Sequence, residues 1–114
     1  MTLTTWLAFA AASATGAVAR YLVDGAITGR FPWGTLVVNA TGSFLCGFLT
    51  GLALAHGPRI VLVTGFCGAY TTFSTFTYET VRLVEEGSMA AAVGNVAATA
   101  LTCAVAAAAG LALA

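Results

Sequence analysis

The chain has 114 residues, of which 60% are hydrophobic and 7% are charged, and its formal net charge is zero. Soluble domains normally carry about a quarter charged residues, so this composition indicates a protein that lives in lipid. The chain contains no lysine, so we expect no nucleic-acid partner and no basic patch for anionic lipid. The first residues lack a basic n-region, and we therefore expect no cleaved signal peptide.

Uncharged stretches between the few charges are each long enough to cross a bilayer, which takes about 20 apolar residues. They predict four transmembrane helices, over about residues 3–26, 33–55, 60–84 and 88–112. Glycine and proline at 29–32 and 56–59 are typical of turns. Because the four spans use nearly the whole chain, we predict an all-α integral membrane fold with a single domain over residues 1–114.

Arginine placement sets membrane orientation, and here it gives no clear preference. If the N-terminus faces the cytoplasm, Arg59 lies inside while Arg30 and Arg82 lie outside. A near-balanced count favours dual topology, in which copies insert in both orientations and pair antiparallel. The alternative is a protein with one orientation and weak signals.

Polar residues in the first predicted helix follow one face, with Ser13, Gly16 and Arg20 at helical spacing. The guanidinium of Arg20 stays charged and donates hydrogen bonds in a fixed, forked geometry. Arg20 therefore indicates an entrance to a pathway that attracts anions. The alternative is a structural ion pair with Asp24, four residues further on, near the helix end.

Similar polar stripes occur in the second and fourth predicted helices. We interpret them either as lining of a pathway or as contacts between helices, and Gly47-x-x-x-Gly51 fits the second role. An amide is costly at membrane depth, so Asn39 is predicted to be functional. The stripes comprise Asn39, Ser43, Cys46 or Gly47, and Thr50 in the second helix, and Asn95, Thr99 and Thr102 in the fourth.

The third predicted helix differs from the others, because glycines precede a dense run of hydroxyl residues over 65–79. Gly68 indicates a break near the middle of the span, although a packing glycine is the alternative. Non-helical backbone at that depth must be buried in protein or line a cavity, and its free carbonyls suit a small cation such as sodium. Phe73 and Phe76 share a face, and their positive ring edges could replace water around a small anion.

Other reactive side chains give no sign of an enzyme. Cys46, Cys67 and Cys103 fall in three different spans without metal-site spacing, so we interpret them as reduced packing residues. His56 sits in a glycine-proline turn without a nucleophile beside it. We therefore expect that the chain is not an enzyme.

Three motifs, in this order, resemble those of the Fluc (CrcB) fluoride channel family, and the resemblance covers almost the whole chain. They are Gly16-Ala17-Val18-Ala19-Arg20-Tyr21, then Gly34-Thr35-Leu36-Val37-Val38-Asn39-Ala40-Thr41-Gly42-Ser43-Phe44, then Gly65-Phe66-Cys67-Gly68 followed by Thr71-Thr72-Phe73-Ser74-Thr75-Phe76.

This resemblance implies a fluoride-selective channel that exports fluoride passively across a bacterial or archaeal cytoplasmic membrane. It also implies an antiparallel dual-topology homodimer with two pores, a break in the third helix, and a structural sodium ion at the dimer centre. Fluoride, lipid and a second copy of the chain are the implied partners.

Roles for individual residues follow from the same resemblance. Phe73 and Phe76 would turn their ring edges toward fluoride, and Asn39 would be the pore amide. Arg20 would lie in the vestibule, by which we mean the entrance to the pore. The remaining implied residues are Thr72, Ser74 and Thr75 in the hydroxyl-rich stretch beside the pore, and Gly68 and Thr71, whose backbone carbonyls from each subunit would hold the sodium ion.

The chain departs from the family pattern at two places. The glycine that usually follows Gly68 is Ala69, which disfavours positive φ and predicts a slightly different break. The fourth helix lacks the usual tyrosine of a polar track, and Asn95, Thr99 and Cys103 or Thr102 stand in for it.

Two other functions stay open on the residues alone. A small multidrug-resistance-type transporter has similar length, four helices and dual topology, but it uses a carboxylate in its first helix to bind cations. Here the first span carries Arg20, with Asp24 only near its end. The other alternative is a non-conducting assembly subunit, in which the polar stripes serve only for packing.

Overall fold

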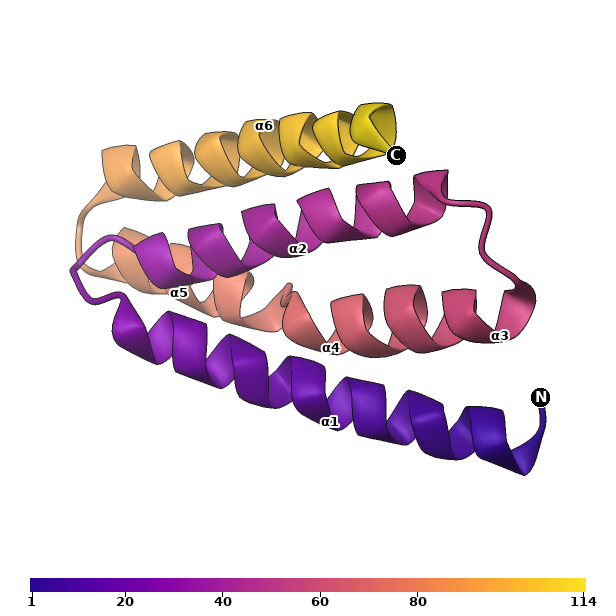
Figure 1. The fold of residues 1–114 in the computed structure, drawn as a ribbon. Coiled ribbons are helices and arrows are strands. Elements are labelled where there is room, and N and C mark those ends of the chain that lie inside the picture. The colour runs from indigo at the N-terminus through magenta and orange to yellow at the C-terminus, as the bar shows by residue number, and fades with distance from the viewer.

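Four long helical segments lie side by side in the computed structural model, which describes all residues from Met1 to Ala114 (Figure 1). The first, second and fourth are single helices, whereas the third is assembled from four shorter pieces that include a π-helical stretch. The elements are α1 (Leu3–Ala26), α2 (Trp33–Gly51), α3 (His56–Arg59), η1 (Ile60–Cys67), α4 (Gly68–Tyr70), α5 (Ser74–Glu85) and α6 (Met89–Leu113).

Each of the four segments is long and apolar enough to cross a membrane, which confirms the predicted number of spans. The predicted bounds of the second span were wrong at its end, because α2 stops at Gly51 rather than at residue 55. Leu52 adopts an extended backbone conformation, with φ −77° and ψ 144°. Residues 52–55 then link α2 to α3, so the third segment begins at His56, four residues before the predicted start.

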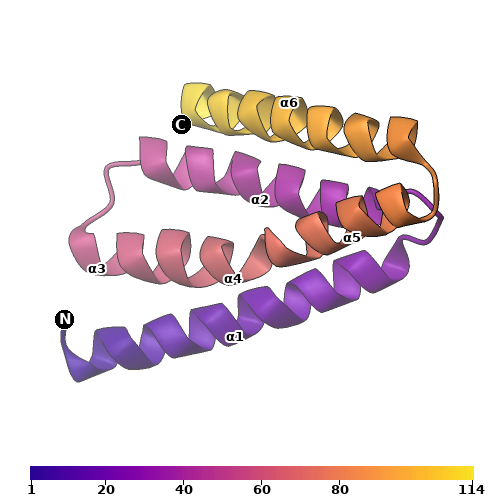
Figure 2. The same ribbon diagram turned by 180° about the vertical axis from the view of Figure 1, so that it is seen from behind.

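Helix α2 lies in the middle of the bundle, between α6 on one side and the third segment on the other (Figures 1 and 2). Helix α1 packs along η1 and α4 on the opposite edge. Because the number of spans is even, the two termini lie at the same end of the molecule (Figure 2). The bundle measures 50 × 28 × 21 Å, and its long axis suits a bilayer with its headgroup layers.

Small residues bring α2 and α6 into close contact. A Cβ atom at Gly47 would collide with the carbonyl group of Ala107, and one at Gly110 would collide with the carbonyl group of Phe44. Such close backbone approach is typical of helix pairs in membranes, where dispersion contacts replace the hydrophobic effect. The interpretation of Gly47 as a packing residue is therefore confirmed.

The turn between α5 and α6 is fixed by Gly87, which adopts φ +81°. The Gly87 N–H donates to the carbonyl of Val84 at 3.0 Å, and the Ser88 N–H donates to the carbonyl of Leu83 at 2.8 Å. This is a Schellman motif, which satisfies the last carbonyls of a helix and needs a residue that tolerates the left-handed conformation. It ends α5 after Glu85 and starts α6 in the opposite direction.

Most of the side-chain surface of a single chain is not covered by the chain itself, since 16 of 114 residues are buried. The small core contains Val38, Leu83 and Ala92, together with the polar Asn95, which is 2% exposed. Large apolar side chains such as Leu7 and Leu101 are exposed on the outer faces. This surface is suited to contact with lipid or with a second copy.

Replacing Gly110 by valine is predicted to destabilise the bundle, because the added side chain would have to force α6 away from α2. Overpacking of this kind costs roughly 1–3 kcal/mol. The loss can be measured as the temperature at which detergent-solubilised protein no longer elutes as a single species. Gly94→Ala on the same helix is the matched control, because a Cβ there meets nothing within 4 Å. Equal melting of Gly110→Val and Gly94→Ala would contradict the close contact.

Candidate functional site

The third segment loses its helical hydrogen bonds between α4 and α5. Helix α4 ends at Tyr70 because Thr71 is extended, with φ −79° and ψ 159°, and α5 begins at Ser74. Gly68 is itself helical, with φ −61° and ψ −36°. The backbone therefore departs from the helix three residues beyond the predicted glycine. Only glycines have positive φ in this chain, so Ala69 adopts no strained backbone conformation. The replacement of the family's usual glycine by Ala69 therefore causes no backbone strain.

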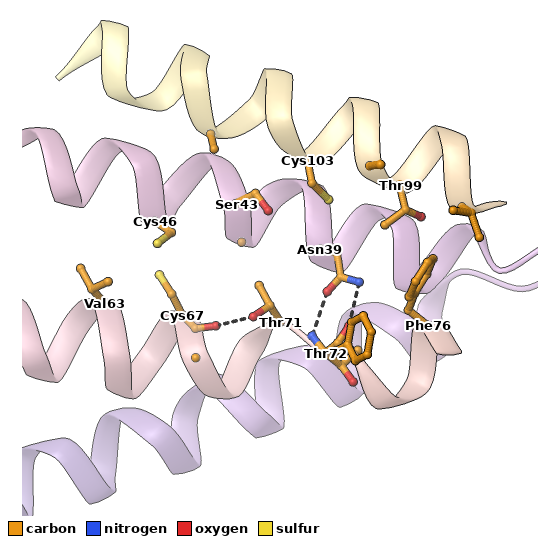
Figure 3. Close-up of a pocket in the computed structure, with 16 residues that line it drawn as sticks. Asn39, Ser43, Cys46, Val63, Cys67, Thr71, Thr72, Phe76, Thr99 and Cys103 are labelled. Carbon is orange, nitrogen blue, oxygen red and sulfur yellow. Dashed lines mark hydrogen bonds between the residues drawn. The ribbon is translucent and has the colours of Figure 1, made fainter. Parts of the chain in front are cut away.

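The side chain of Asn39 holds this interruption from the neighbouring helix α2 (Figure 3). Its Nδ2 donates to the backbone carbonyl of Thr72 at 2.9 Å, and its Oδ1 accepts from the backbone N–H of Thr72 at 2.8 Å. Asn39 is 7% exposed, so both bonds are shielded. A buried polar backbone group without a partner is costly, and this amide supplies both partners for Thr72.

The same contacts leave two backbone carbonyls free. In a continuous α-helix the Thr72 N–H would donate to Gly68 O and the Thr75 N–H would donate to Thr71 O. Here the first N–H goes to Asn39, and the second goes to the Thr72 hydroxyl at 3.2 Å. Neither Gly68 O nor Thr71 O accepts a backbone hydrogen bond. These are the two carbonyls that the family resemblance assigns to sodium, and their chemistry fits a small hard cation.

A cavity of about 640 Å³ opens beside the interruption, bounded by α2, the third segment and α6. Its wall combines aliphatic and aromatic side chains with hydroxyl, amide and thiol groups, and no charged side chain lines it. Six of the residues to which the family resemblance assigns a pore or sodium role meet there: Asn39, Gly68, Thr71, Thr72, Phe73 and Phe76.

Phe73 and Phe76 stand at one end of this cavity, at the start of α5. Their ring centroids are 5.9 Å apart and the planes are tilted by 46°, so the two rings are not stacked. Phe73 is 77% exposed on the single chain, whereas Phe76 is partly covered. The tilt gives the rings differently directed edges, which carry the positive part of the aromatic quadrupole.

Arg20 lies in a second, smaller cavity of about 260 Å³ between α1, α2 and the start of α5. Asp24, Thr35 and Thr75 share this cavity, and Thr72 lines both cavities. Arg20 and Asp24 share this cavity without forming a salt bridge, since the two salt bridges of the chain join Arg30 with Glu86 and Arg82 with Glu86.

Ser74 lines neither of these cavities. Its side chain is exposed, and its hydroxyl lies 3.4 Å from the hydroxyl of Thr72. Thr72 in turn donates to the hydroxyl of Thr75 at 3.1 Å. The three predicted hydroxyl residues are therefore linked, although they face different spaces.

Two further polar contacts connect the site to its surroundings. The hydroxyl of Thr35 donates to the carboxylate of Glu79. Asn95, which is fully buried, donates to the hydroxyl of Thr80 at 2.9 Å, and that hydroxyl donates to the carbonyl of Phe76 at 2.8 Å. Asn95 thus ties α6 to the turn of α5 that carries Phe76. The polar stripe pointed to Asn95, but its partner Thr80 could not be read from spacing within one helix.

Comparison with known proteins gives one consistent result. Residues 7–111 match the family model described as CrcB-like protein, Camphor Resistance (CrcB). The fluoride-specific ion channel FluC of Nitrobacter winogradskyi is 53% identical over 75% of this chain and 75% of its own length. The fluoride-specific ion channel FluC 1 of Frankia casuarinae is 47% identical over 96% and 95%. FluC of Geobacter sulfurreducens is also 47% identical, over 89% of each chain.

Replacing Asn39 by leucine is predicted to destabilise the fold, although the number and branching of the side-chain heavy atoms are kept. Both backbone groups of Thr72 lose their partner, which costs roughly 2–6 kcal/mol in total. The midpoint of thermal unfolding in detergent measures the loss. Ser43→Ala is the matched control, because Ser43 lies one turn further along α2 and lines the same cavity. A leucine variant as stable as Ser43→Ala would show that the clamp on Thr72 is dispensable.

Proposed function

The chain belongs to the CrcB-like protein family and is a multi-pass cell membrane protein, and from this premise we propose that it is a fluoride-selective channel. It exports fluoride passively, and it works as an antiparallel dual-topology homodimer with two pores. The relatives named as fluoride-specific ion channels support the choice of ion. Conduction breaks no covalent bond, so the chain needs no catalytic residue.

The observation that carries this proposal is the uncharged cavity that joins Phe73 and Phe76 to amide and hydroxyl groups. A channel must bind its ion well enough to admit it and weakly enough to release it. Ring edges and neutral donors meet both conditions for a small anion, whereas a fixed cation in the wall would trap it. Asn39 uses one amide hydrogen on Thr72, so its second amide hydrogen is left to donate.

Arg20 supplies the positive charge outside the uncharged cavity. A fixed cation at an entrance raises the local concentration of anions without binding them inside the pathway. Thr72 borders both the cavity of Arg20 and the larger cavity. Its hydroxyl, with that of Thr75, offers an anion a polar connection between the two spaces.

The dimer in this proposal is held by a structural sodium ion at its centre. Gly68 and Thr71 would contribute their backbone carbonyls from each subunit, and the missing helical partners of these carbonyls support that role. When bound, sodium supplies a fixed charge that joins the two chains. The open cavity of a single chain supports a second copy as the remaining wall of each pore.

Export follows from the acid chemistry of fluoride. Hydrogen fluoride is neutral and crosses lipid in acid surroundings, then releases its proton in the less acidic cell interior. The anion cannot return through lipid, so a passive channel lets it leave down its gradient. A transporter for organic cations would need a carboxylate in its binding cavity, and none of the carboxylates of this chain lines the larger cavity.

Purified protein in liposomes loaded with fluoride is predicted to release fluoride when a counter-ion path is opened, as followed with a fluoride electrode. Chloride release from matched liposomes should stay at the level of empty liposomes, because the cavity suits a small anion. Release no faster than from empty liposomes, or equal chloride release, would overturn the proposed function.

Replacing Phe76 by isoleucine is predicted to slow fluoride release about tenfold or more, which corresponds to about 1.4 kcal/mol added to the barrier. The change removes an aromatic edge but keeps an apolar side chain. Phe44→Ile is the matched control, since Phe44 lies on α2 and lines neither of the two cavities. Size-exclusion elution should show the same assembly for both variants. Unchanged release in Phe76→Ile would remove Phe76 from the pathway.

A further inference from the structure

Three cysteines from three different segments line the larger cavity. Cys46 comes from α2, Cys67 from η1 and Cys103 from α6, and none of them forms a disulfide. From the sequence alone, the three cysteines are interpreted as separate packing residues, because they fall in three different spans. The fold brings all three thiols to the wall of one cavity. Conduction of an anion does not require such a group of thiols.

Two of the three thiols form a pair. The side chains of Cys46 and Cys67 point toward one another across the gap between α2 and η1 (Figure 3), and both line the same cavity. Cys103 lies on α6, on another part of the cavity wall. No three His, Cys, Asp or Glu side chains lie close enough to hold one metal ion together. The cavity therefore contains a two-sulfur arrangement rather than a three-sulfur one.

We propose that Cys46 and Cys67 form a binding site for a thiophilic divalent cation that accepts two ligands, with mercuric ion as the representative. Each thiol loses its proton, two sulfur–mercury bonds form, and two protons pass to water. The product is electrically neutral, which matters because a net charge within the membrane is costly.

The same reasoning excludes the other common cations. Zinc prefers four ligands, and the pair offers two. Magnesium, calcium and manganese prefer oxygen ligands to sulfur. Silver or copper(I) between two thiolates would leave a net negative charge in an uncharged cavity. A soft divalent ion with linear coordination is the class that satisfies both ligand number and charge.

The pair stands close to the helix interruption. The carbonyl of Cys67 accepts a hydrogen bond from the hydroxyl of Thr71 at 3.0 Å, one turn further along the chain. Mercury on the pair would occupy the cavity beside Gly68 and Thr71. Bound mercury obstructs the fluoride pathway, and this consequence rests on the proposed function. The binding of mercury itself does not depend on conduction.

The test uses the full chain in detergent without reducing agent, treated with one equivalent of mercuric chloride and then challenged with excess monothiol. A two-sulfur chelate resists the monothiol, whereas mercury on a single cysteine is removed. We expect one retained mercury per chain by elemental analysis, and loss of two of the three free thiols. Cys103→Ser, the matched control, should retain one mercury, and Cys46→Ser and Cys67→Ser should retain none.

Three results would overturn the site: retention in Cys46→Ser or Cys67→Ser equal to the unmodified chain, loss of retention in Cys103→Ser, or no retained mercury in the unmodified chain. Unchanged size-exclusion elution of each variant shows that it is folded. Mercury should also lower fluoride release in the unmodified chain and in Cys103→Ser, but not in the other two variants after the monothiol wash. A chain that retains mercury but never conducts fluoride would contradict the proposed function while supporting the site.

Discussion

The two hydrogen bonds between the side chain of Asn39 and the backbone of Thr72 are the interaction on which the rest of the site depends. No water is available in the hydrocarbon core to satisfy a broken helix, so an interruption persists there only when protein groups take its N–H and carbonyl. An asparagine side chain offers a donor and an acceptor of the right reach. An aspartate would lack the donor, and a leucine would lack both.

Several features of the site follow from this clamp. The Thr72 N–H is diverted to α2 and the Thr75 N–H to a hydroxyl, so the carbonyls of Gly68 and Thr71 keep no helical partner. The restart of the helix at Ser74 places Phe73 and Phe76 at the end of an uncharged cavity. The buried Asn95 fixes the other side of this turn through Thr80. Two asparagines on neighbouring helices thus hold the short segment between them.

The spans could be predicted from the sequence because the cost of a charge in lipid acts locally along the chain. The motif resemblance predicted that Phe73, Phe76 and Asn39 belong to one site, and the three residues line the same cavity. The partner of Asn39 could not be deduced, because the two residues are 33 positions apart and only helix packing brings them together. Likewise, glycine content suggested a break at Gly68, but the hydrogen bonds to Asn39 place it at residues 71–73. The facing positions of Cys46 and Cys67 also depend on the packing of α2 against η1.

The central claim is that this pathway selects fluoride over other anions. The most direct measurement is the reversal potential of the current across a planar bilayer, with fluoride on one side and chloride at equal concentration on the other. The account predicts a current carried by fluoride alone, so that the potential follows the fluoride gradient and does not respond when chloride is replaced by a larger anion. A reversal potential near zero, or one that moves with chloride, would contradict it.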